Sequence, residues 1–188
     1  MTSSTSKSKP RTLRTIGYGN RSFEQMTTKA KELGVHLLVD VRSRPHSKFQ
    51  PDFNRPRLED GLPKVGLDYI FMGDFLGGIP DEGHRLPDGR IDYKSISQER
   101  WFMNGLRRLA SKLDGAGSVS LMCSELRPEK CHRAKLLGYL FAQHDIEVEH
   151  IDENYELKTQ SEVIHRLTKG QVTLGNDESF AHTSRRPR

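Results

Sequence analysis

Short apolar runs alternate along this chain with segments in which apolar side chains recur every three or four positions. Five runs have the length of buried strands: 13–17, 36–41, 67–72, 119–123 and 146–151. Four segments have helical periodicity: 22–33, 98–113, 129–141 and 161–167. Strands that alternate with helices are typical of an open parallel sheet. We therefore predict a single-domain α/β fold, with a mainly parallel sheet of about five strands and helices on both faces.

Local signals mark the ends of the first elements. Ser22 and Gln25 form a capping box at the start of the first helix, and Gly34 ends it. The run at 36–41 is almost continuously apolar, which is typical of a strand buried on both faces of a sheet. The first strand, helix and second strand therefore predict a right-handed βαβ unit.

Two segments lack a regular pattern. Four prolines between 45 and 63 are expected to prevent a long helix there, leaving one turn at 57–62. The polar stretch at 75–90 is expected to be a long surface excursion. Long loops inside compact domains are uncommon and often functional. We therefore expect this excursion to lie over the site.

The length of 188 residues fits one α/β domain at 12–168, between basic tails at 1–11 and 169–188 that we predict to be disordered. The net charge of +5 is compatible with phosphate-bearing partners. No run of eighteen apolar residues occurs, so no membrane span is expected. Two cysteines and an N-terminus without a signal-peptide pattern predict a cytoplasmic protein with reduced thiols.

The densest group of reactive side chains lies in LMCSELRPEKCHR, at 121–133. An apolar strand ends at Cys123, a proline follows, and Cys131-His132-Arg133 opens the next helical segment. Ligands of open α/β sheets bind beyond the carboxyl ends of the strands. This block is therefore the predicted site.

A second polar block, DVRSRPHSKF at 40–49, follows the strand at 36–41. We expect the ends of strands 36–41 and 119–123 to open onto one positively charged hollow. Arginine binds phosphate and carboxylate through a planar fork, and the helix expected from about 129 would aim N–H groups at the same region. The predicted anion-binding residues are Arg42, Ser43, Ser47, Asn20, Arg127 and Arg133, with Arg44 beside them.

Glu125, Asp40 and Cys131 are the candidate catalytic residues. The two carboxylates lie at or just after strand ends, and a carboxylate pair can divide acid and base roles in hydrolysis or in glycosidic-bond cleavage. Cys131 is expected in the first turn of a helix near three basic residues, which would favour its thiolate. The structural alternative is an ion pair for the carboxylates and inert, buried thiols.

Cys123, Cys131 and His132 would be three of the ligands if a metal were bound, with Glu125, His150 or His46 as a fourth, and zinc is the ion that such residues prefer. Their spacing is neither C-x2-C nor H-x3-H, and neighbouring residues on a helix point about 100° apart. No cofactor is therefore predicted. A metal-binding or thiol-redox protein stays open as an alternative function.

Five segments resemble the domain of unknown function 488 family, in the same order and at similar spacing over about 13–151. They are TIGYGNRSFEQ, LLVDVRSRPHSKFQPDFN, LGG, LMCSELRPEKCHR and VEHI. The chain departs from many relatives at Tyr18-Gly19, where they carry His-Ser. If that histidine acts in the relatives, this chain cannot use it at that position. The resemblance implies a fold and a site, and says little about the reaction.

The combined observations predict a small enzyme that acts on a phosphate-bearing small molecule, a nucleotide or a nucleic acid. Arginines would hold the anion, and carboxylate or thiol groups would carry out the chemistry. The main alternative is a non-catalytic nucleic-acid-binding module, whose affinity would fall steeply with salt.

Overall fold

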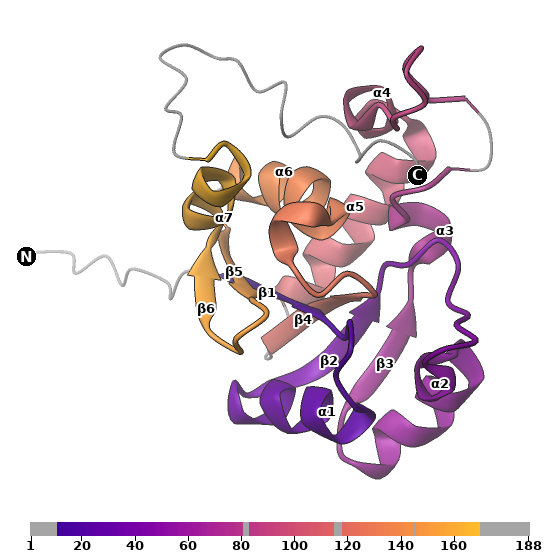
Figure 1. Cartoon of the computed structure of the whole chain (residues 1–188), viewed down its shortest axis with the longest axis vertical. Helices are drawn as coiled ribbons and strands as arrows, with labels where there is room; N and C mark the ends of the chain where they lie inside the picture. The colour runs from indigo at the N-terminus through magenta and orange to yellow at the C-terminus, as the bar shows by residue number, and fades with distance from the viewer. Residues whose placement is uncertain (1–10, 81–82, 115–117, 145, 170–188) are drawn as a thin grey trace, which may run out of the picture.

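The computed structural model describes residues 11–80, 83–114, 118–144 and 146–169. At its centre is one sheet in the order β3-β2-β4-β1-β5-β6 (Figure 1). The six strands are β1 (Thr12–Gly17), β2 (Val35–Asp40), β3 (Asp68–Phe71), β4 (Ser118–Cys123), β5 (Glu147–Ile151) and β6 (Leu157–Thr159). The first five are parallel, and β6 pairs antiparallel with β5. The predicted α/β fold is confirmed.

The helices are α1 (Phe23–Glu32), α2 (Arg55–Lys64), α3 (Gly73–Leu76), α4 (Tyr93–Ser97), α5 (Arg100–Leu113), α6 (Tyr139–Ala142) and α7 (Gln160–Leu167). Two 3-10 turns, η1 (Pro51–Phe53) and η2 (Pro128–Lys130), supplement them. A π-helix, η3 (Arg133–Gly138), leads directly into α6. π-Helical segments are rare and often lie at functional sites.

Successive strand residues face opposite sides of the sheet, so an apolar core forms on each side. On one side, Val39 and Leu121 belong to the core formed with α5, η3 and α6. On the other side, Leu38 and Met122 belong to the core formed with α1 and α2. Helices therefore cover both faces as predicted. β2 and β4 are neighbouring inner strands, so their carboxyl ends lie next to each other.

The beginning of the chain folds as its local signals predict. The hydroxyl of Ser22 accepts from the backbone N–H of Gln25 at 3.1 Å, and the Gln25 side chain accepts from the N–H of Ser22 at 2.9 Å. β1, α1 and β2 form a parallel βαβ unit in which β4 lies between the two strands.

The sheet has one strand more than the five that the sequence indicated, because β6 is too short and too exposed to produce a hydrophobic period. Two predictions about the helices were wrong. α2 runs for ten residues because Pro56 lies in its first turn, where no helical N–H bond is lost, and because the second proline, Pro63, comes only one residue before the helix ends. The helix expected from about 129 begins later, because Cys131 has extended backbone (φ −119°, ψ 147°).

α3 leads into the polar excursion predicted at 75–90 and α4 follows it, and Arg85 forms an isolated antiparallel bridge with Ile91. Apart from Arg11 and Lys169, the predicted tails at 1–11 and 169–188 lie outside the described residues. Among the described residues, no helix is long and apolar enough to cross a membrane.

Candidate functional site

A cleft opens where β2 and β4 end. The two strands are neighbours, and the ladder continues past β2 because the N–H of Val41 donates to the carbonyl oxygen of Met122 at 3.1 Å. The cleft has a volume of about 410 Å³. Its lining residues are Arg42, Ser43, Arg44, Gly78, Ile79, Arg85, Gly89, Ile91, Tyr93, Cys123, Ser124, Glu125, Lys130, Cys131 and His132. The shared hollow expected at the ends of strands 36–41 and 119–123 is thus present.

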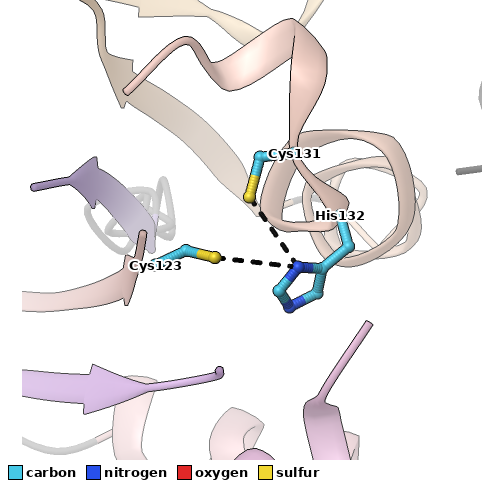
Figure 2. Close-up of side chains that lie close together, drawn as sticks. All are labelled: Cys123, Cys131 and His132. Atoms are coloured by element: carbon cyan, nitrogen blue, oxygen red, sulfur yellow. Dashed lines mark hydrogen bonds between the residues drawn. The ribbon is translucent and has the colours of Figure 1, made fainter. Parts of the chain in front are cut away.

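Two cysteines and a histidine form the most reactive part of this lining (Figure 2). The sulfur of Cys123 lies 3.9 Å from His132 Nδ1, and the sulfur of Cys131 lies 3.7 Å from the same nitrogen. All three ligating atoms lie within 4.8 Å of one another, and both thiols are free. All three residues are buried. They are called the Cys–Cys–His cluster below.

The backbone around Pro128 explains how two adjacent residues reach the same point. η2 ends at Lys130, and the extended Cys131 then precedes the helical segment that starts at His132. The Cys131 carbonyl accepts from the N–H of Lys135 at 3.1 Å, and its sulfur accepts from the N–H of Arg133 at 3.5 Å. Cys131 therefore occupies an N-cap position, and the 100° separation expected of neighbours within a helix does not apply.

A backbone hydrogen bond fixes the ring of His132. Its Nε2 lies 3.0 Å from the carbonyl oxygen of Val41. A carbonyl oxygen only accepts, so Nε2 carries a proton and donates it to Val41, and Nδ1 is the ring nitrogen that faces the two sulfurs. The strand end of β2 thus sets the tautomer of a residue 91 positions away.

The two thiols ionise differently. A hydrogen bond from the Cys131 thiol lowers the pKa of Cys123 well below its usual value, and the charges of His132 and Arg133 act in the same direction against the effect of burial. Burial raises the pKa of Cys131, and its hydrogen bond to Cys123 adds to that rise. The pair therefore favours a thiolate on Cys123, whereas the sequence favoured one on Cys131.

The excursion after β3 reaches the cleft, where Gly78, Ile79, Arg85 and Gly89 contribute to the lining. The N–H of Ile79 donates to the hydroxyl of Ser43 at 2.9 Å, which ties the excursion to the end of β2. At Gly78, an added Cβ would lie 2.5 Å from Cγ of the His132 ring. Glycine is therefore required for this close approach, which explains part of the Leu-Gly-Gly motif.

Asp40 and Arg42 form a buried ion pair beside the cleft. Arg42 Nε donates to Asp40 Oδ1 at 2.8 Å and its Nη2 donates to Oδ2 at 2.5 Å. The hydroxyls of Tyr69 and Tyr18 complete the group, at 2.8 Å from Oδ2 and 3.3 Å from Nη1. Burial first, and then the Asp40 charge, raise the pKa of Tyr69. Asp40 does not line the cleft, so it is not placed there as a partner of Glu125, which does.

Arg133, the second arginine expected to hold the anion, is fully buried. Its guanidinium donates to Thr15 Oγ1 at 3.2 Å, to the Leu126 carbonyl at 2.9 Å and to the Glu125 carbonyl. These bonds hold the turn after β4 against β1. Arg133 therefore stabilises this turn, and it is not among the residues that line the cleft.

Three further predicted anion-binding residues lie outside the cleft lining. The Ser47 hydroxyl accepts from the backbone N–H of Gln50 at 3.0 Å, and Asn20 is exposed. Arg127 forms ion pairs with Glu129 at 3.1 Å and Glu153 at 2.8 Å. Of the predicted anion-binding set, Arg42 and Ser43 line the cleft, together with Arg44.

A family model for the domain of unknown function DUF488 matches residues 22–140, more than half of the chain. The chain belongs to the DUF488 family. The match spans β2, β4 and the whole Cys–Cys–His cluster. No curated protein and no solved structure matches the chain.

This DUF488 chain also has cleft residues that sequence reasoning did not assign to the site. Arg85 and Lys130 line the cleft and are exposed. Arg85 comes from the excursion, and the only signal for it was the expectation that this excursion covers the site. Lys130 is one of the three basic residues that were expected to favour the Cys131 thiolate, and it was given no other role.

Proposed function

We propose that this protein is a small enzyme that binds a phosphate-bearing molecule in the cleft and acts on it with the Cys–Cys–His cluster. One observation carries the proposal: a buried group of two thiols and an imidazole shares its cleft with exposed cationic side chains. Active sites commonly combine an orienting charge with a few convergent reactive groups in one concave site.

The charge of the lining supports an anionic substrate. Arg44, Arg85 and Lys130 contribute three exposed cationic side chains, whereas Glu125 is the single carboxylate among the cleft residues. The two arginines offer planar forks that fit phosphate oxygens, and the lysine offers a flexible point charge. Hydroxyl groups of Ser43 and Ser124 lie in the same lining and can donate to further phosphate oxygens.

The size of the cleft favours a small molecule over a polymer. Its volume of about 410 Å³ falls within the range of roughly 300–1,000 Å³ that is typical of small-molecule sites. A mononucleotide or a similar phosphate ester fits this class. A nucleic acid bound without catalysis would instead need a long positively charged track outside the cleft.

Glu125 is the proposed proton carrier. It is half-buried and lines the cleft together with Cys123. General acid–base catalysis by a carboxylate requires such a position beside the reacting group. The proposal therefore retains Glu125 and the cluster as reactive groups, and it assigns Asp40 to the support of the cleft wall.

Calorimetric titration with inorganic phosphate and with 5′-mononucleotides tests the binding step. The double variant R85A/K130A should bind the best probe at least about tenfold more weakly, because two charge-assisted contacts are lost. The single variant R57A, which removes an exposed arginine on α2, is the matched control and should bind like the wild type. Equal weakening in R57A, or no binding of any probe, would contradict the proposal.

Turnover is tested by screening the same phosphate esters for release of phosphate or of a free base. E125Q should bind the reactive ester with unchanged affinity but lose most of the turnover. Unchanged turnover in E125Q would remove Glu125 from the mechanism. Strong binding of long oligonucleotides that R85A/K130A does not weaken would favour the nucleic-acid-binding module instead.

A further inference from the structure

We propose that the Cys–Cys–His cluster is a binding site for a divalent transition-metal ion, with zinc as the preferred ion. Zinc binds thiolate sulfur at about 2.3 Å and imidazole nitrogen at about 2.0–2.1 Å, usually in tetrahedral geometry. These bond lengths require a sulfur–nitrogen separation of about 3.6 Å and a sulfur–sulfur separation of about 3.8 Å. The observed sulfur–nitrogen distances are 3.7 and 3.9 Å, and all three atoms lie within 4.8 Å of one another. An ion can therefore be bound with little rearrangement.

The surroundings of His132 provide an independent argument. Metal-bound histidine usually donates its other ring N–H to a carboxylate or to a backbone carbonyl, which fixes the ring and its tautomer. His132 does so with the Val41 carbonyl at 3.0 Å. Figure 2 shows Nδ1 and both sulfurs pointing toward one another. Gly78 packs against the ring, at a distance that leaves no space for a side chain.

The donor set selects the kind of ion. Thiolates and imidazole are soft or borderline ligands that favour zinc over magnesium or calcium. Three residues form the cluster among those the structure describes, and all three line the cleft. A fourth coordination position is thus open to water or to a substrate oxygen, which is the arrangement of catalytic rather than structural zinc sites.

The role of such an ion in catalysis rests on the proposed function, but its binding does not. A metal at this position would lie in the same cleft as Arg85 and Lys130, and it would act as a Lewis acid toward an oxygen of the bound phosphate ester. Binding of the ion can therefore be tested without a substrate.

The test uses the full chain, purified without a histidine tag, and zinc and cobalt ions as probes. Elemental analysis should find about one zinc ion per wild-type chain after purification or after incubation with Zn²⁺. The cobalt-loaded wild type should show the strong visible absorption of tetrahedral cobalt and a near-ultraviolet sulfur-to-cobalt charge-transfer band. C123S, C131S and H132Q should each bind zinc at least about tenfold more weakly. H36Q, which changes an exposed histidine, should retain the wild-type spectrum.

A second measurement uses only the wild type, in case a cysteine variant does not fold. Titration with an organomercurial in the presence of a zinc-sensitive dye should release one zinc ion as two thiols react. A folded wild type that neither retains nor takes up a stoichiometric ion would overturn the inference, as would equal loss of zinc in H36Q. R85A/K130A should keep its zinc while losing anion binding, so failure of the metal site and failure of the proposed function are distinguished.

Discussion

His132 and Val41 are joined by a 3.0 Å hydrogen bond between the imidazole Nε2 and the backbone carbonyl oxygen. The bond links the beginning of the helical segment at 132–142 to the end of β2. It holds the other ring nitrogen toward Cys123 and Cys131. The geometry of the Cys–Cys–His cluster is therefore set by main-chain positions of the sheet, which are hard to displace.

Replacing Gly78 by alanine should disturb the cluster. The new methyl group would overlap the His132 ring at 2.5 Å from Cγ and 2.8 Å from Nδ1. We expect G78A to lose most of the cobalt charge-transfer absorption and to lower the unfolding temperature. In the control G61A, the nearest atom is on the Phe23 ring at 3.3 Å, and alanine favours the helix by up to about 1 kcal/mol. A normal cobalt spectrum in G78A would show that the ring tolerates displacement.

The Asp40–Arg42 pair should be important for stability. In D40A, the guanidinium of Arg42 would remain buried without its carboxylate, which typically costs about 3–5 kcal/mol. Urea unfolding should report this loss. The exposed pair of Lys64 and Asp60 provides the control, because D60A should change the free energy of unfolding by less than about 0.5 kcal/mol. Similar losses in the two variants would contradict this account.

His150 should make the fold sensitive to acid. Burial lowers its pKa to about 3, so the folded state keeps the ring neutral while the unfolded chain binds a proton near pH 6.5. Stability is therefore fully present above pH 6.5 and is lost as the pH falls from 6.5 toward 3, by at most about 1.4 kcal/mol per pH unit. Urea unfolding between pH 7 and 4 should show a shallower loss for H150Q than for the wild type. The exposed-site variant H36Q should follow the wild type, and a wild-type slope in H150Q would refute the assignment.

Arg133 should not be replaceable by lysine. R133K keeps the charge but cannot reach the oxygens of Thr15, Glu125 and Leu126 together. Leaving such buried acceptors unsatisfied should cost at least about 2 kcal/mol in urea unfolding. R107K on the exposed side of α5 is the matched control and should be neutral. A neutral R133K would indicate that water or lysine satisfies these acceptors.

The sequence predicted the sheet and most helices well because buried parallel strands are apolar runs and the helices between them have amphipathic faces. The prediction from hydrophobic periodicity failed for α2 and β6, whose formation depends on the positions of a few residues. Pro56 is tolerated in α2 because it lies in the first turn, and β6 has only three residues. These features depend on the helix register and on a neighbouring strand, so hydrophobic periodicity does not reveal them.

For the site, the sequence located the block around Cys123 but not the contacts of each residue. A metal was disfavoured because Cys131 and His132 were placed on one helix, whereas Cys131 has extended backbone. Residue type alone also did not distinguish an arginine that lines a cleft from one that holds the backbone, as Arg133 does. Arg85 reaches the cleft through tertiary contacts of the excursion, which no local pattern encodes.

Because Arg133 is buried, substitutions should be tolerated less well in the turn after β4 than in the segment 83–90, and both segments contribute residues to the cleft. The turn after β4 is bonded through Arg133 to the centre of the sheet, so substitutions that move this turn are penalised by lost stability. Apart from Gly83 and Gly89, whose positive φ angles favour glycine, the segment 83–90 consists of exposed and half-buried residues, whose replacement costs little. New substrate preferences in related chains should therefore arise by substitutions in 83–90, while the Cys–Cys–His cluster stays unchanged.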